Sequence, residues 1–187
     1  MGAKVVFFIG KPGCGKGTQA RLLSEQTGWQ VFSSGKLFRA IAEEDTFAGR
    51  KSKKELAEGL LMPHWFAMYL YLKKLFELSD NESAIFDGFN RKEDEAKLIM
   101  DSMRWLGRDY QVINIEVSDK AVQERLLKRY EAEKRDDDLS VDMRLIEYRT
   151  YTEPTLEIFK EAGVLYNING EETPEEIAKK VREVVGA

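Results

Sequence analysis

The sequence predicts an α/β fold in which a mostly parallel, five-stranded sheet is covered by helices on both faces. Three observations lead to this prediction. Short runs rich in β-branched and aromatic residues alternate with segments that carry apolar residues at helical spacing. A glycine-rich stretch joins the first of these runs to the first helical segment. The 187 residues are 43% hydrophobic, which is enough for one sizeable core and fits one domain.

Five segments are predicted to form the strands. Each is short, rich in β-branched or aromatic residues, and ends in polar residues or glycine. In chain order they are KVVFFIG (4–10), WQVFSS (29–34), SAIFDGF (83–89), YQVINIEV (110–117) and VLYNING (164–170).

Helical segments fill most of the intervals between these strands. The last helix is predicted to begin with a capping box, Thr173 and Glu176, and with Pro174 at its first position. Because strands and helices alternate, the sheet should be mostly parallel and covered on both faces. The interval from Gly35 to Ser83 contains no convincing strand and is predicted to hold two or three helices inserted between sheet strands. The other helical patterns cover 17–27, 93–107, 119–134, 141–163 and 173–185.

The charge balance restricts the partners of this chain. It has 29 basic and 33 acidic residues, a formal net charge of -4, so no global positive field would gather nucleic acid or an anionic membrane. We therefore expect neither partner, and any bound anion must be held by a local cluster. No window approaches ~18 uninterrupted apolar residues, and no cleavable apolar leader is evident, so a cytoplasmic location is expected.

The cysteine and histidine counts restrict the metal chemistry. The single cysteine, Cys14, excludes a disulfide framework and any multi-cysteine zinc site. The single histidine, His64, cannot supply the missing ligands. A metal ion should therefore be bound by oxygen ligands, and zinc is not expected.

The stretch FFIGKPGCGKGTQA (7–20) predicts a phosphate-binding loop. Its glycines let backbone N–H groups curl around an anion at the positive end of the helix that Lys16 opens. In the general phosphate-loop motif the lysine is followed directly by Ser or Thr, whereas here Gly17 intervenes and Thr18 comes second. Cys14 is a small residue within this loop and is assigned no catalytic role.

The variant motif GKPGCGKGTQA resembles the P-loop of the nucleoside monophosphate kinase family, most closely that of the adenylate kinases. Further segments resemble that family's motifs in the same order along the chain, and together they cover nearly all of it. They are SSGKLFRAI (33–41), GLLMP (59–63), FDGFNR (86–91), RLLKR (125–129), RDDD (135–138) and RLIEYRTYTEP (144–154).

The resemblance implies a P-loop NTPase-type fold in a single kinase domain spanning 1–187. The domain would have a helical monophosphate-binding insertion at about 35–80 and a very short lid at about 129–136. The lid is short because only YEAEK separates Arg129 from Arg135, which is too little for a larger lid, with or without zinc. The core would then comprise 1–34, 81–128 and 137–187.

The resemblance also implies a role for each cation. Lys16 is expected to hold the β and γ phosphates of the donor, and Arg39 and Arg91 the acceptor monophosphate. Because phosphoryl transfer brings many negative charges together, positioning and electrostatic neutralisation carry the catalysis, and arginine suits this by pairing bidentately with phosphate. For any one arginine the alternative is a solvated helix face. Four more arginines would close over the donor and the transferring group: Arg125, Arg129, Arg135 and Arg144.

One carboxylate is expected to organise magnesium. Asp87 ends a predicted strand, at the sheet edge where ligands of open α/β folds bind. It should order the waters of Mg²⁺, with Thr18 near the metal or phosphate from the first helical turn. Asp137 and Asp138 either support the lid arginines or cap the next helix.

The candidate site residues fall into three overlapping sets. The catalytic set is Lys16, Asp87, Arg91, Arg129, Arg135 and Arg144. The ATP-binding set is Gly13, Cys14, Gly15, Lys16, Gly17, Thr18, Arg125 and Arg129. The monophosphate-binding set is Ser34, Gly35, Arg39, Met62, Gly88, Arg91, Glu95, Arg135 and Arg144.

The activity predicted from this resemblance is that of an adenylate kinase. It would be a reversible, Mg²⁺-dependent transfer from ATP to AMP giving two ADP, by direct in-line displacement, in a monomeric enzyme of nucleotide biosynthesis. One alternative is a kinase for another monophosphate, GMP and then CMP or UMP. The other is a nucleotide-binding regulator with weak ATPase activity, against which the full arginine set argues.

Three positions depart from the adenylate kinase pattern. Lys36 replaces an aspartate, Asn90 a proline, and Glu95 a glutamine four residues after Arg91. A glutamine amide can accept from the adenine amino group and donate to N1, whereas an ionised carboxylate only accepts and would suit guanine better. AMP remains the first choice because the other motifs favour it and Glu95 can be protonated, solvated or turned away from the base. Selection by Ser34 and the backbone around Met62 is the alternative.

Overall fold

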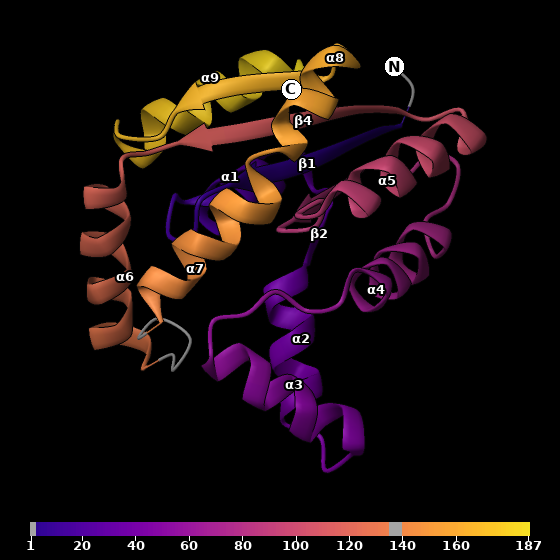
Figure 1. Cartoon of the computed structure of the whole chain (residues 1–187). Coiled ribbons are helices and arrows are strands. Elements are labelled where there is room, and N and C mark those ends of the chain that lie inside the picture. The colour runs from indigo at the N-terminus through magenta and orange to yellow at the C-terminus, as the bar shows by residue number, and fades with distance from the viewer. Residues whose placement is uncertain (1–2, 135–139) are drawn as a thin grey trace.

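The computed structural model describes residues 3–134 and 140–187, and these residues form a sheet with helices on both of its faces (Figure 1). The strands are β1 (Lys4–Gly10), β2 (Gln30–Ser33), β3 (Ala84–Asp87), β4 (Asp109–Glu116) and β5 (Leu165–Asn169). All four pairings are parallel, and the strand order is β2-β3-β1-β4-β5. The predicted five-stranded parallel sheet is therefore confirmed.

Alternate side chains of β1 point into two separate cores. Val6 and Phe8 pack in one core with α1 (Lys16–Thr27), α6 (Asp119–Glu133) and α9 (Pro174–Val185). Val5, Phe7 and Ile9 pack in the other. That second core is covered by α2 (Ser34–Ala42), α4 (His64–Phe76), α5 (Glu93–Leu106) and α8 (Thr155–Glu161). The central strand is buried on both faces, which explains why its sequence is an uninterrupted apolar run rather than an alternating one.

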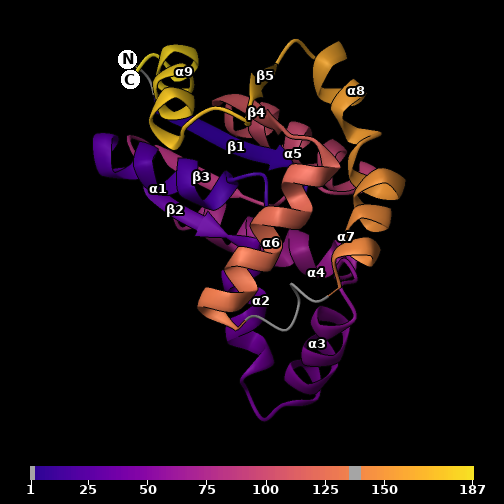
Figure 2. The ribbon, with the colours of Figure 1, turned by 90° about the vertical axis from the view of Figure 1, so that its left-hand side faces the viewer.

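Three helices occupy the interval between β2 and β3, for which the sequence predicts two or three. They are α2, α3 (Phe47–Ala57) and α4. Thr46 caps α3 by accepting a hydrogen bond from the Gly49 N–H. α2 and α3 project away from the sheet in both views, whereas α4 lies beside α5 (Figures 1 and 2).

The helical pattern at 141–163 is not one regular helix. α7 (Val141–Glu147) continues into a π-helical turn, η2 (Tyr148–Thr152), and α8 begins after Pro154. Pro154 has no N–H to donate to the preceding turn, and its ring crowds that turn's carbonyls. The Glu153 N–H instead donates to the Tyr148 carbonyl at 2.8 Å. This i→i+5 hydrogen bond widens the turn, which accommodates the proline that follows.

The parallel arrangement brings the carboxyl ends of the strands to one edge. Ser33 and Phe8 are both in register with Asp87, so the end of β3 lies beside the phosphate loop that follows β1. Figure 2 looks onto this edge, with α6 in front of the sheet and α7 to the right of α6. Within the described residues no helix is both long and apolar enough to cross a membrane.

Replacing Phe86 should destabilise the fold strongly. Its side chain is fully buried, and its ring lies 5.1–5.7 Å from the rings of Tyr71, Phe7, Phe32 and Phe89. Because the cavity would be enclosed by packed rings, Phe86→Ala should cost about 3–5 kcal/mol of unfolding free energy in urea titrations. Phe47→Ala is the control, since Phe47 is 83% exposed and its removal should change stability by ~0.5 kcal/mol or less. Equal losses in the two variants would contradict this account of the core.

Candidate active site

A cavity of about 700 Å³ opens at the carboxyl edge of the sheet. Every candidate site residue within the described part of the chain lines this cavity. Arg135, together with Asp137 and Asp138, lies outside the described residues. The residues that line it are Gly13, Cys14, Gly15, Lys16, Gly17, Thr18, Ser34, Gly35, Arg39, Met62, Asp87, Gly88, Arg91, Glu95, Arg125, Arg129 and Arg144.

The floor of the cavity is the glycine-rich loop between β1 and α1. Gly10 has φ +137°, and a Cβ there would lie 2.6 Å from the Ile115 carbonyl oxygen, so only glycine fits against β4. Gly15, with φ +106°, precedes α1 and has no side chain to cap it. The N–H groups of the first helical turn therefore remain available to an anion, at the positive end of the helix.

Lys16 holds its ammonium group inside this loop. Its Nζ donates to the carbonyl oxygens of Gly10 at 2.8 Å and Lys11 at 2.7 Å, and lies 3.4 Å from Cys14 Sγ. Burial lowers the pKa of Lys16, while the nearby Cys14 and Asp87 oppose this shift. A bound polyphosphate would supply the full negative charge that these neutral carbonyls lack.

Asp87 faces the start of α1 from the end of β3. Its Oδ2 accepts a hydrogen bond from Ser33 Oγ at 3.1 Å and would lie 3.6 Å from a Cβ on Gly17. Thr18 is exposed in the same first turn. A carboxylate and a hydroxyl are the oxygen ligands that Mg²⁺ accepts, directly or through water. Among the described residues no group of three or more His, Cys, Asp or Glu side chains could hold a metal ion by itself.

Two arginines occupy space that glycines leave free on the opposite side of the cavity. Arg91 Nε donates to the Gly88 carbonyl at 2.6 Å, and Ser34 Oγ donates to the same oxygen at 2.7 Å. A Cβ at Gly88 would lie 2.5 Å from Arg91 Nη2 and 2.9 Å from Ser34 Oγ. Likewise, a Cβ at Gly35 would lie 3.3 Å from Arg39 Nη1. A side chain at position 88 would displace the Arg91 guanidinium, whereas one at position 35 would require only a small shift of Arg39.

Glu95 is buried and has a second role that the sequence analysis missed. Its Oε2 accepts a hydrogen bond from the Arg91 N–H at 2.7 Å, just before α5 begins. Burial raises the pKa of Glu95, although the N–H and charge of Arg91 and the charge of Lys92 oppose this. The position of Glu95 three residues after the N-cap residue Lys92 is the signal that could have revealed this capping contact.

Arginines of α6 and α7 line the same cavity. Arg125 donates to the Cys14 carbonyl at 3.2 Å and to the Gly170 carbonyl at 2.8 Å, so it joins the phosphate loop to the turn before α9. Arg129, on α6, and Arg144, on α7, are the others.

The sequence analysis also missed contacts between the insertion and α7. Glu147 Oε2 accepts from the Leu61 N–H at 2.9 Å, and Ser140 Oγ donates to the Ala57 carbonyl at 2.8 Å. Gly59 permits this approach, because a Cβ there would lie 2.7 Å from Cβ of Ser140. Neither Ser140 nor Glu147 belongs to a pattern that marks such a contact in advance.

Asn90 departs from the family pattern for a visible backbone reason. Its φ is +63°, a left-handed conformation that asparagine tolerates and that the ring of proline forbids. The side chain is fully buried, and its amide atoms have no hydrogen-bond partner among the described residues. Lys36 lines the cavity.

Comparison with known proteins identifies one family. A family model described as adenylate kinase matches residues 8–164. The chain is 33% identical over 181 residues to the adenylate kinase of Leptospira biflexa, covering 95% of this chain and 97% of that protein. It is 33% identical over 184 residues to adenylate kinase 1 of Synechocystis sp. (98% and 97%), and 33% identical over 186 residues to the adenylate kinase of Thermus thermophilus (98% and 97%).

Adding one methyl group at Gly88 should displace two of the side chains that line the cavity. Gly88→Ala displaces both Arg91 and Ser34, so AMP binding measured by calorimetry should weaken at least about tenfold, the scale of one lost charge-assisted hydrogen bond. ATP binding should change by less than about twofold, because the phosphate loop is untouched.

The matched control for this variant is Gly107→Ala. Gly107 also has a positive φ, +62°, but a Cβ there would meet nothing within 4 Å. This variant therefore reproduces the backbone strain without the clash. If both variants bind AMP equally well, the close packing of Gly88 against Arg91 has no part in the acceptor site.

Proposed function

Because this chain belongs to the adenylate kinase family, we propose that its cavity is the active site in which ATP phosphorylates AMP. The reaction is the reversible conversion of ATP and AMP into two ADP, and the enzyme is a nucleoside monophosphate kinase. The observation that carries the assignment of the site is the meeting of cations from five parts of the chain around one cavity. They come from the phosphate loop, α2, the β3–α5 connection, α6 and α7.

This charge arrangement favours a kinase over a nucleotide-binding regulator. A protein that only binds ATP needs cations where the ATP phosphates lie. Here Lys16 and Arg125 contact the glycine loop, whereas Arg39 and Arg91 lie beside Gly35 and Gly88. Cations on both sides are useful when two phosphate chains meet and charge develops between them.

The donor phosphates would bind in the phosphate loop. Lys16 Nζ would exchange the carbonyl oxygens of Gly10 and Lys11 for oxygens of the β and γ phosphates, while the first-turn N–H groups of α1 hold the same phosphates. Arg39 and Arg91 would bind the AMP phosphate in line with the γ phosphate. The contacts of the insertion with α7 would help to exclude water, which otherwise competes with AMP as the acceptor.

The residues at the end of β3 and the start of α1 fit a magnesium ion that arrives with ATP. Asp87 and Thr18 would bind it, through water, from the oxygen ligands that Mg²⁺ prefers. When bound, the ion would neutralise charge on the β and γ phosphate oxygens. A monomeric state, a cytoplasmic location, and the division into core, insertion and lid stay predictions.

One product assay tests the proposed function. The protein is incubated with Mg·ATP and each of AMP, GMP, CMP and UMP, and the nucleotides formed are resolved by chromatography. We expect ADP to accumulate in an AMP-dependent manner, as two molecules per ATP consumed, and chelation of Mg²⁺ to stop it. Release of inorganic phosphate at the same rate with or without any monophosphate would instead show a simple ATPase.

Removing the loop ammonium should nearly abolish transfer. Lys16→Met should keep the fold and lower kcat by ~10³ or more, on the scale of about 2.7–4 kcal/mol for lost transition-state electrostatics. Lys97→Met is the control, because Lys97 lies on the exposed face of α5, paired with Glu93. A folded Lys16→Met enzyme with a kcat close to that of Lys97→Met would exclude this lysine from the mechanism.

The buried Glu95 predicts a pH-dependent choice of base. Below its raised pKa the protonated carboxyl can donate to adenine N1, whereas above that pKa the carboxylate only accepts and favours guanine. The kcat/KM ratio of AMP over GMP should therefore fall as pH rises through the pKa of Glu95. The acceptor phosphate also titrates, but it does so alike in AMP and GMP and cancels in the ratio.

The Glu95→Gln variant provides the test of this base preference. Its ratio should be independent of pH and about tenfold or more above that of the wild type at high pH, since mismatched buried polar groups cost ~1–3 kcal/mol. If the ratio of the wild type is flat and Glu95→Gln does not change it, Glu95 serves α5 alone and the base is selected elsewhere, as by Ser34 and the backbone around Met62.

A further inference from the structure

The phosphate loop contains a second lysine that does not line the cavity. Lys11 directly follows β1, and its Nζ donates to Asp119 Oδ1 at 2.6 Å and to the Val117 carbonyl at 3.0 Å. Val117 follows β4, and Asp119 is the first residue of α6. The Lys11 side chain thus fixes the loop to the start of the helix that carries Arg125 and Arg129. The Lys11 carbonyl also accepts a hydrogen bond from the Lys16 ammonium at 2.7 Å, so Lys11 contacts both the catalytic lysine candidate and the start of α6.

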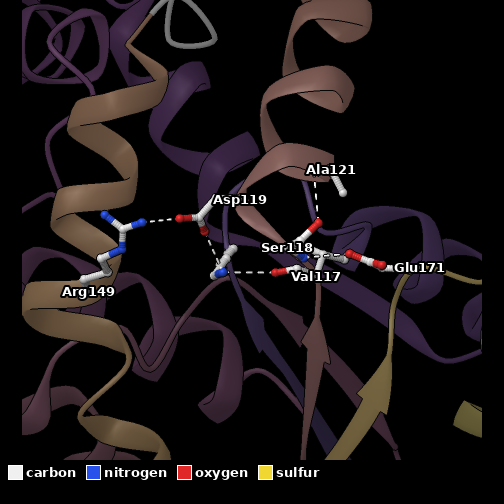
Figure 3. Close-up of polar contacts among 7 residues, drawn as sticks. Val117, Ser118, Asp119, Ala121, Arg149 and Glu171 are labelled. Atoms are coloured by element: carbon white, nitrogen blue, oxygen red, sulfur yellow. Dashed lines mark hydrogen bonds and ion pairs between the residues drawn. The ribbon is translucent and has the colours of Figure 1, made fainter.

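Asp119 uses its other oxygen to reach a third element. Its Oδ2 forms a hydrogen-bonded ion pair with Arg149 Nη2, as Figure 3 shows. Arg149 lies in η2, directly after the α7 helix that carries Arg144. The hydrogen bond from Lys11, and the charges of Lys11 and Arg149, lower the pKa of Asp119.

The start of α6 is held by two further contacts. The Ser118 N–H donates to Glu171 Oε1 at 2.8 Å, and Ser118 Oγ accepts from the Ala121 N–H at 3.3 Å (Figure 3). The first contact ties the start of α6 to the turn before α9, and the second caps the first turn of α6 next to Asp119. Because the start of α6 is held in place, Asp119 can hold the elements of its two partner cations in fixed positions relative to α6.

We propose that Lys11, Asp119 and Arg149 form a positioning network that fixes the phosphate loop, α6 and α7 relative to one another. The inference rests on the proposed function, because these three elements carry Lys16, Arg125, Arg129 and Arg144. None of the three network residues lines the cavity, so none is a catalytic residue. Their effect on the reaction is exerted through the placement of the cations that do line it.

The exposure of the network separates positioning from stability. The side chains of Lys11, Asp119 and Arg149 are 22%, 37% and 53% exposed, and partly exposed ion pairs add little to folding stability. Transfer between two bound nucleotides depends much more steeply on geometry, since a misplacement of about 1 Å can cost ~10²-fold in rate. Loss of the network should therefore lower kcat with little change in Tm.

The test compares Asp119→Ala with Asp101→Ala. Asp101 is also a helical aspartate paired with an arginine, Arg104, but the pair is exposed on α5 and lies outside the cavity. Each variant is measured for Tm, for kcat and KM with ATP and AMP, and for calorimetric affinity toward ATP and toward a bisubstrate dinucleotide with two adenosines joined by five phosphates. The bisubstrate ligand needs the cations of both sides at once, whereas ATP needs those of the donor side.

Asp119→Ala should lower kcat and the bisubstrate affinity about tenfold or more, and ATP affinity by clearly less, because the network places Arg144 as well as the donor-side cations. Asp119→Glu, which keeps the charge, should recover part of the loss. Arg149→Met should lower kcat in wild type but add little to Asp119→Ala, because both remove the same link.

Three outcomes overturn the inference, and they are distinguishable. If the wild type makes no ADP from AMP, the proposed function is wrong, and the inferred positioning role of the network is wrong as well. If the wild type is active but Asp119→Ala matches Asp101→Ala in kcat and in bisubstrate affinity, the proposed function stands and the network has no positioning role. A loss of kcat that is accompanied by an equal loss of ATP affinity and a large fall in Tm would show a merely structural role.

Discussion

The Lys16 ammonium, enclosed by the glycine loop, is the interaction on which the rest of this site depends. Two backbone carbonyls, of Gly10 and Lys11, hold it where a polyphosphate would lie. The loop reaches this shape because Gly10 closes against the Ile115 carbonyl, where a side chain would clash. Parallel pairing then brings Asp87 to the same edge, in register with Phe8 of β1. The neutral carbonyl oxygens stabilise the Lys16 ammonium in the absence of a ligand, and a bound polyanion would stabilise it much more strongly.

Glycines that lack a side chain also shape the part of the cavity around Arg39 and Arg91. Gly88 and Gly35 leave the room in which Arg91 and Arg39 lie, and Gly59 lets the insertion approach Ser140. Hydrogen bonds from the Leu61 N–H to Glu147 and from Ser140 to the Ala57 carbonyl link the helices between β2 and β3 to α7. Such links hold geometry without great stability, which suits elements that must admit and release two nucleotides.

The sequence was sufficient for the architecture and for the type of the site residues. Short β-branched runs and helical spacing predicted all five strands, because the apolar residues of each strand pack in or against one of the two cores. The π-helical turn before Pro154 was not predicted, because the periodicity of residue types does not determine which carbonyl accepts the hydrogen bond of each N–H. The capping role of Glu95 and the pairing of Lys11 with Asp119 were not predicted for a related reason. Both are contacts of single side chains, and the second joins distant parts of the chain.

A crystal structure of the protein with Mg²⁺ and the bisubstrate dinucleotide tests the central claim most directly. The account predicts that Lys16 Nζ leaves the carbonyl oxygens of Gly10 and Lys11 and lies about 2.7–3.2 Å from a phosphate oxygen of the donor half. It also predicts that Arg91 contacts the phosphate nearest the acceptor adenosine. A complex in which the ammonium stays on the two carbonyls, with the phosphates bound outside the glycine loop, would contradict it.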